Sequence, residues 1–136
     1  MYRFNAPASF ADSDYKIVRR EQCARSHEHR GLLSRVICEF DVLEVLHTEV
    51  EPGSSCDSQE FGGCSAVHVV IDGTPAFRTS HRSAELMPGD SIVFANDGPY
   101  TISNGAPTRS VILSVLFKRR ATEVQPTLIA AKEVLA

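Results

Sequence analysis

His47 and Glu49 are the first residues with chemical capacity to stand out, because they interrupt an otherwise apolar, strand-like run over residues 42–50. Both side chains can exchange a proton, the imidazole near neutral pH. Side chains alternate between the two faces of a strand, so the phase of this run decides where they point. If the inner face is that of Val45, both groups enter a pocket, whereas if it is that of Leu46, they face solvent or a partner. The pattern leaves both phases open.

A His-x-His pair, His27 and His29, lies in the polar segment 26–31 and invites a metal-binding interpretation. The pair has no second pair of ligands at metal spacing, and it lies well upstream of the turn at Pro52 and Gly53. We therefore interpret segment 26–31 as a polar loop, solvated or hinge-like.

The elements that must position these groups are short strands separated by turns. Turn signals recur at fairly even intervals, at Pro52-Gly53, Gly62-Gly63, Asp72-Gly73, Pro88-Gly89, Asp97-Gly98 and Asn104-Gly105. The segments between them are rich in apolar and β-branched residues, and the strand candidates are residues 15–19, 33–40, 42–50, 67–71, 91–95 and 110–117. Many short strands with Gly and Pro turns predict an all-β sandwich or barrel.

The spacing of these turns resembles the two sequence motifs of the cupin superfamily. The fixed points of the first motif fall, without a gap, on Pro52, Gly53, Gln59, Phe61, Ala66 and Gly73, and those of the second on Pro88-Gly89-Asp90, Gly98, Tyr100 and Asn104. The resemblance covers about residues 26–118 and implies a double-stranded β-helix, the cupin jelly-roll barrel. The polar His/Gly segment ahead of the first motif is similar to that of the small single-domain cupins that include aromatic polyketide cyclases.

The resemblance implies that the metal-ligand positions of this chain are replaced. In metal-binding cupins four motif residues hold the metal, and here these positions are Gln59, Phe61, Ala66 and Tyr100. Phe and Ala have no ligating atom, and Gln and neutral Tyr are poor ligands for the usual transition metals. We therefore expect a cupin pocket that binds no metal and no other cofactor.

The same match to the cupin motifs predicts that His68 and Tyr100 are site residues. Because Ala66 takes an inward-pointing ligand position, His68 and Val70 should point inward as well. His68 could transfer a proton near neutral pH, or it could be a core histidine satisfied by a backbone carbonyl. Tyr100 could polarise a carbonyl or orient an enol, or it could fill the space that the metal uses elsewhere.

The predicted site combines these groups in a mainly hydrophobic pocket with a few directed polar groups, as small-molecule sites have. Gln59 can donate and accept hydrogen bonds, and Phe61 adds apolar surface on which a ligand can stack. The predicted catalytic residues are His68, Tyr100 and Glu49. The predicted substrate-binding residues are Gln59, Phe61, Ala66, His47 and Val70.

Composition and charge indicate which kinds of partner the protein has and where in the cell it is expected. A chain of 136 residues with a formal net charge of −3 suits one domain with its own core, and it has no basic stripe for nucleic acid. No apolar run reaches the length of a membrane span, and residues 1–7 contain no signal-type segment, so we expect a cytoplasmic protein. The four cysteines are expected to be free thiols there, although Cys56 and Cys64 bracket a turn that a bridge could span.

The two ends of the chain differ from the barrel. Residues 1–13 are polar and contain proline, which predicts an irregular arm. Pro126 suits the first turn of a helix, and the residues after it are rich in helix formers, so a short helix is predicted over residues 126–135. Such a helix is too short to be stable alone in water and should pack on the barrel or on a second subunit. We expect a homodimer.

Three functions fit these observations. The first is a metal-independent cyclase, isomerase or lyase of specialised metabolism, acting on a largely apolar small molecule. The second is a non-catalytic cupin that binds a ligand or regulates. The third is a metalloenzyme with an unusual ligand set, His47, Glu49 and His68. The first is favoured because polar groups remain in a pocket whose metal ligands are replaced.

Overall fold

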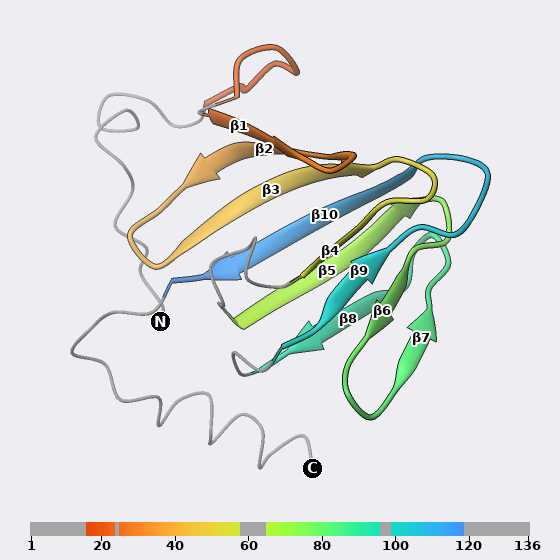
Figure 1. Ribbon diagram of the computed structural model, residues 1–136. Coiled ribbons are helices and arrows are strands. Elements are labelled where there is room, and N and C mark those ends of the chain that lie inside the picture. The colour runs from red at the N-terminus through yellow and green to blue at the C-terminus, as the bar shows by residue number, and fades with distance from the viewer. Residues whose placement is uncertain (1–15, 24, 58–64, 96–98, 119–136) are drawn as a thin grey trace.

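The computed structural model describes residues 16–23, 25–57, 65–95 and 99–118, and these residues form an all-β fold without a helix. Figure 1 shows a layer of long strands with a smaller group of short strands beside it. The strands are β1 (Arg25–His29), β2 (Leu32–Glu39), β3 (Leu43–Val50), β4 (Ser55–Asp57), β5 (Ser65–Asp72), β6 (Ala76–Arg78), β7 (Ser83–Glu85), β8 (Ser91–Phe94), β9 (Thr101–Ser103) and β10 (Ser110–Phe117). The predicted all-β class is confirmed.

The strands form two antiparallel sheets. The larger sheet has the order β1-β2-β3-β10-β5-β8, and the smaller has the order β4-β9-β6-β7. Strand β10 lies at the centre of the larger sheet because it pairs with β3 on one side and with β5 on the other. Two sheets that alternate along the chain in this way make a jelly-roll barrel, with its inner faces turned toward each other.

The turns that suggested the fold meet in space. The amide of Gly53, a residue with φ of 77°, donates a hydrogen bond to the Asn104 carbonyl at 2.7 Å, and the Asn104 amide donates to the Ser54 carbonyl at 2.9 Å. The Asn104 side chain is buried and donates to the carbonyls of Val50 and Thr108. These bonds hold the turn after β3 against the end of β9, which gives a structural reason for the Gly53 and Asn104 positions of the two motifs.

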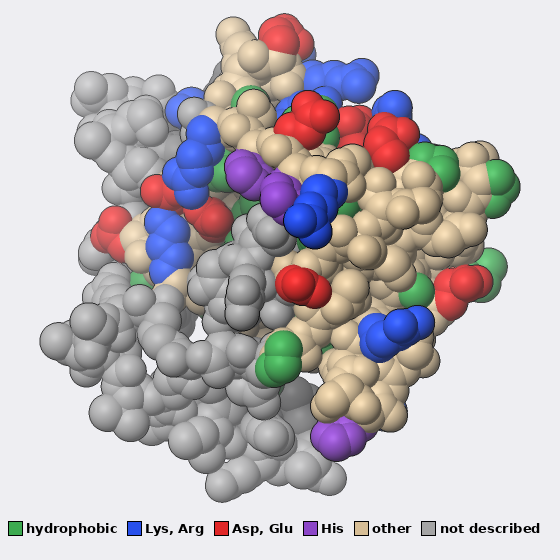
Figure 2. Space-filling model, viewed as in Figure 1, with side chains coloured by type: hydrophobic (Ala, Val, Ile, Leu, Met, Phe, Trp, Pro, Cys, Tyr) green, Lys and Arg blue, Asp and Glu red, His purple; other side chains and the backbone are tan. Residues whose placement is uncertain are grey.

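The surface carries charges of both signs. Figure 2 shows Lys and Arg side chains interspersed with Asp and Glu side chains across the face toward the viewer. Many of them are paired, as Arg25 is with Glu39 at 2.6 Å and with Glu44 at 2.7 Å. This mixing agrees with the small net charge of the sequence.

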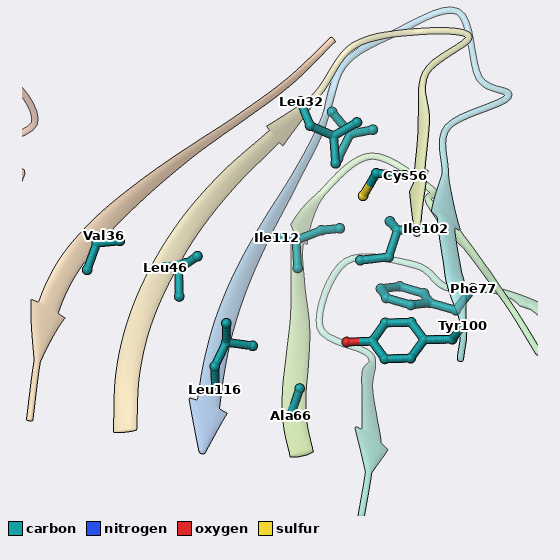
Figure 3. Close-up of a cluster of buried hydrophobic side chains, with 11 residues drawn as sticks. Leu32, Val36, Leu46, Cys56, Ala66, Phe77, Tyr100, Ile102, Ile112 and Leu116 are labelled. Atoms are coloured by element: carbon teal, nitrogen blue, oxygen red, sulfur yellow. The ribbon is translucent and has the colours of Figure 1, made fainter. Parts of the chain in front are cut away.

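The core lies between the two sheets (Figure 3). The alternation that builds the core is clearest in strand β10, where buried residues alternate with more exposed ones over the whole strand. Ile112 and Leu116 face the core from the larger sheet, and Phe77 and Ile102 face it from the smaller one. Strand β10 has the bounds predicted for the final core strand, residues 110–117.

Strand β3 settles the phase that the sequence left open. Leu46, Thr48 and Val50 are buried, and Leu46 and Val50 belong to the core cluster. His47 and Glu49 therefore point to the outer face of the larger sheet, where both contact Arg35. The prediction that they line the barrel pocket is wrong, because a shift of one residue exchanges the two faces of a strand.

The interpretation of segment 26–31 as a loop is also wrong. Residues 25–29 form β1, which pairs with β2 and is an edge of the larger sheet. Arg30 and Gly31 have φ of 49° and 87°, the two positive values of a tight hairpin turn. The polar, charged sequence of β1 hides a strand because an edge needs no apolar alternation and is protected by charge. The strand expected at residues 15–19 is not formed over the described residues 16–19.

The two predictions for the ends of the chain fall outside the described residues. These are the arm over residues 1–13 and the helix over residues 126–135. Cys23 and Cys38 are free thiols, while Cys64 also lies outside the described part. Within the described residues, no helix is long and apolar enough to span a membrane.

Candidate functional site

The barrel interior contains a chain of three polar side chains centred on His68. His68 lies on the inner face of β5 and is 0% exposed. Its Nδ1 atom lies 2.7 Å from the Ser114 hydroxyl, and its Nε2 atom lies 2.8 Å from the Tyr100 hydroxyl. Ser114 comes from β10, directly opposite His68 in the strand register, and Tyr100 immediately precedes β9. The chain therefore links both sheets through the core.

Aromatic rings enclose this chain. The Phe94 ring stacks on the Tyr100 ring with 3.8 Å between centroids and 3° between planes. The His68 ring lies 5.4 Å from the Phe77 ring and 6.0 Å from the Phe94 ring. In Figure 3 the Tyr100 hydroxyl points from the smaller sheet toward β5. The packing fixes the phenol and excludes water, so Tyr100 is only 4% exposed.

Burial determines the protonation state of His68. Desolvation lowers the pKa of His68 from its ordinary value of 6.5 to about 4, so the ring is neutral at physiological pH. A neutral imidazole donates from one nitrogen and accepts at the other. The hydrogen bonds can therefore run from Ser114 through His68 to the Tyr100 oxygen, or in the reverse direction.

A pocket of about 320 Å³ opens on the same inner face of the larger sheet. Its apolar floor is Leu32, Val36, Leu46 and Cys56, and its polar rim includes Arg25, His27, His29, Ser34 and Glu44. Val36, Leu46, Ser114 and His68 follow one another across four neighbouring strands. Two strand spacings separate Leu46 from His68, which is about 10 Å.

The other predicted interior residues divide into two groups. Ala66 and Val70 are buried on β5, on the same face as His68, and Ala66 lies opposite Phe94 of β8. Gln59 and Phe61 lie outside the described residues. The structure therefore brings together His68 and Tyr100, with Ala66 and Val70 beside His68 on the strand.

Glu49 and His47 belong to a different cluster on the outer face. The Glu49 carboxylate contacts Arg35 at 3.3 Å, Arg109 at 3.6 Å and Arg20 at 3.8 Å. Glu49 therefore has no part in the interior site. The ligand set of His47, Glu49 and His68 is wrong for the same reason, since His68 faces the opposite side of the sheet.

Ser114 and Phe94 are the site residues that the sequence did not identify. Ser114 is a hydroxyl residue in the apolar run of β10, in phase with the buried Ile112 and Leu116. Its spacing of two residues from Ile112 and Leu116 could have identified Ser114 as an interior residue, but only once the inner face of the strand is known. The stacking of Phe94 on Tyr100 joins residues on separate elements and has no local signal.

The rim histidines do not complete a metal site. His27 and His29 point the same way from β1, with ring centroids 6.1 Å apart. Among the described residues, no group of three His, Cys, Asp or Glu side chains is placed to hold a metal ion.

No protein-family model matches this chain, and no curated protein sequence is significantly similar to it. Solved structures of cupins are similar in fold. The cupin domain of an XRE family transcriptional regulator from Enterobacter cloacae is 18% identical, with a TM-score of 0.59, over 67% of this chain and all of that domain. KdgF from Halomonas sp. is 13% identical, with a TM-score of 0.63, over 77% of this chain and 96% of that one.

A sugar phosphate isomerase of the cupin superfamily from Silicibacter pomeroyi is 14% identical, with a TM-score of 0.61, over 76% of each chain. At these identities the similarity shows the fold alone. The chain has the cupin jelly-roll fold, which the sequence motifs predicted.

Proposed function

We propose that this protein is a metal-independent enzyme of the cyclase or isomerase kind, acting on a largely apolar small molecule in the barrel interior. One observation carries the proposal: the buried hydrogen-bonded chain from Ser114 through His68 to Tyr100. Buried polar groups reduce stability unless they are paired, so three of them aligned in an apolar core favour a role in positioning one reactive group.

Tyr100 is the reactive group in this proposal. When Ser114 donates to His68 and His68 donates to the Tyr100 oxygen, the phenol becomes a stronger hydrogen-bond donor toward a substrate oxygen. A fixed donor in a site of low dielectric constant stabilises the negative charge that develops on a carbonyl oxygen during enolisation. His68 and Ser114 act through Tyr100 and are positioning residues, because neutral His68 supplies orientation and not charge.

The residues at the ligand positions do not fit a metal. Ala66 has no donor atom, and the Tyr100 oxygen is engaged by His68 at 2.8 Å. Tyrosine would have to lose its proton to bind a metal well, and a neutral His68 provides no positive charge to favour that loss. The chemistry of this donor set supports a reaction without a metal.

The neighbouring pocket supports a substrate with an apolar body. Its floor is apolar, and its volume lies at the lower end of the range for small-molecule sites. Holding a flexible molecule in one shape lowers the barrier of a cyclisation or isomerisation by several kcal/mol. The polar rim would hold a polar end of such a molecule, with its apolar body on the floor of the pocket.

Enolisation of a 1,3-diketone tests this proposal without knowledge of the natural substrate. The measurement is the exchange of the central C–H of benzoylacetone for deuterium, followed by NMR in D₂O. We expect the protein to accelerate exchange and Tyr100→Phe to lower the rate about a hundredfold. EDTA should leave the wild-type rate unchanged.

Thr101→Val is the matched control, because it removes an outward-facing hydroxyl one residue away that bonds to Asp57. This variant should keep the wild-type rate. A folded Tyr100→Phe variant that retains the rate would refute the role of Tyr100, and loss of the rate in EDTA would refute metal independence.

A second candidate is a ligand-binding or regulatory cupin. It is supported by the similarity to the cupin domain of a transcriptional regulator, all of which this chain covers. The same experiment separates the two candidates. Benzoylacetone that shifts the NMR signals of the protein but exchanges no faster than in buffer favours binding without catalysis.

A further inference from the structure

A second pocket, of about 400 Å³, lies on the outer face of β2 and β3, on the opposite side of the larger sheet from His68. Segment 16–23 forms one wall and the outer side chains of the sheet form the floor. The polar lining residues are Arg19, Arg20, Arg35, His47 and Glu49. Apolar surface comes from Val18, Ile37 and Val111.

The charges of this pocket do not balance. Three arginines and one carboxylate line it, which leaves a formal excess of two positive charges with His47 neutral. Arg109 approaches the same carboxylate, Glu49, at 3.6 Å, but it is paired with Glu51 at 2.9 Å and so leaves the excess unchanged. Arg35 and Glu49 are largely covered, with side chains 17% and 11% exposed, so water screens this field only in part.

The arginines also have donors to spare. Arg35 and Arg20 lie 3.3 Å and 3.8 Å from Glu49, whereas an arginine–carboxylate hydrogen bond of full strength is about 2.7–2.9 Å long. Arg35 also contacts His47 Nδ1, at 3.4 Å. Each guanidinium carries five N–H groups in a fork that suits a carboxylate. One glutamate cannot satisfy three such forks.

We propose that this outer pocket binds a small organic anion, a carboxylate attached to an apolar group. The carboxylate accepts hydrogen bonds from Arg20 and Arg35, and the apolar group covers Val18, Ile37 and Val111. Glu49 holds the arginines in place and at the same time weakens anion binding by repulsion. The site is separate from the interior chain and does not depend on the function proposed for it.

The test uses the full-length protein and benzoate as the probe, with binding measured by NMR titration in buffer of low ionic strength. Benzoate should bind, whereas benzamide, which has the same shape without the charge, should not. Inorganic phosphate, which lacks the apolar group, should bind more weakly than benzoate. Affinity for benzoate should fall in 0.5 M NaCl because salt screens the arginines.

Variants locate the site. Arg20→Gln should weaken benzoate binding about fivefold, and its folding should be unaffected because the Arg20 side chain is 77% exposed. Glu49→Gln should tighten binding about threefold, because it removes the repelling charge. Arg78→Gln, an exposed arginine of the smaller sheet, is the matched control and should change nothing.

The interior site is controlled in the same titration. Tyr100→Phe should bind benzoate as the wild type does, since Tyr100 lies in the barrel interior. Equal binding of benzoate and benzamide would overturn the proposal. Unchanged affinity in both Arg20→Gln and Glu49→Gln would also overturn it, and would leave the arginines as a structural ion cluster that ties segment 16–23 to the sheet.

Discussion

The two faces of the larger sheet solve the same problem, how to place polar side chains on a strand, in opposite ways. On the inner face, His68 makes hydrogen bonds of 2.7 Å and 2.8 Å and is 0% exposed. On the outer face, Glu49 is surrounded by arginines at 3.3–3.8 Å, of which Arg20 is largely exposed and Arg109 is half-exposed. The interior chain at His68 consists of neutral, closely paired groups, whereas the cluster around Glu49 on the outer face is charged.

The reason lies in solvation. A charge inside an apolar barrel loses its hydration, and the pKa of the group then shifts until the group is neutral. The low pKa of His68 is this effect. On the outer face, partial contact with water keeps the charged groups solvated, so they can stay ionised with longer contacts between them. The inner face therefore suits hydrogen-bond chemistry on a carbonyl, and the outer face suits capture of an anion.

The largest expected effect breaks the interior chain. His68→Ala should lower the free energy of unfolding by about 3 kcal/mol or more, because it leaves a cavity and removes a partner from two buried hydroxyls. His47→Ala, the matched histidine on the outer face, should cost about 1 kcal/mol or less. Urea denaturation of the two variants measures the difference. Equal losses would mean that the two faces do not differ as described.

Acid should act on the interior face nearly as strongly. Because the pKa of His68 is about 4 in the folded protein and near 6.5 in the unfolded chain, only the unfolded chain binds this proton between those values. The contribution of His68 to the free energy of unfolding is therefore fully present above about pH 6.5. It falls by about 3 kcal/mol in all as the pH drops toward 4. Denaturation of His68→Gln between pH 7 and 5 should lack this slope. A variant with the wild-type slope would assign the effect to other groups.

The smallest effect concerns salt. Ser114→Ala should lower the free energy of unfolding by about 1 kcal/mol, equally in low salt and in 1 M NaCl, because the lost hydrogen bond is buried and neutral. Glu49→Gln should cost about 1 kcal/mol or less, and the cost should shrink in 1 M NaCl, since Arg20 and Arg109 are exposed and screened. Paired denaturation curves at the two salt concentrations provide the measurement. A salt-dependent loss in Ser114→Ala would contradict the neutral character of the chain.

The sequence predicted the strands of the larger sheet that are apolar on at least one face, and missed the polar strand β1 and the three-residue strands of the smaller sheet. Strands β2, β3, β5, β8 and β10 were expected within a few residues of their bounds, because burial imposes their composition. Strand β1 was missed because its polar residues carry no such pattern and its formation depends on pairing with β2. The jelly roll followed from the turns, since Gly53 and Asn104 are constrained by the contact they make.

The site was predictable only in part, and for a comparable reason. His68 and Tyr100 were nominated separately by their positions in the two motifs, but the bond between them joins residues 32 apart in the chain. Ser114 lies further away and was not nominated at all. Glu49 was assigned to the wrong face, because its strand has apolar residues in both phases and only the packing of Leu46 and Val50 decides between them.

The central place of β10 has a consequence for how the chain folds. The hairpin of β1 and β2 and the next pairing with β3 are local and can form early, and β5 pairs with β8 over a modest separation. Strand β10 joins these two halves, and its partners in β3 and β5 were synthesised some 40 to 70 residues before it. A sheet closed by non-local pairing folds slowly. During synthesis, the edges of β3 and β5 that pair with β10 therefore stay unpaired until residues 110–117 have been translated.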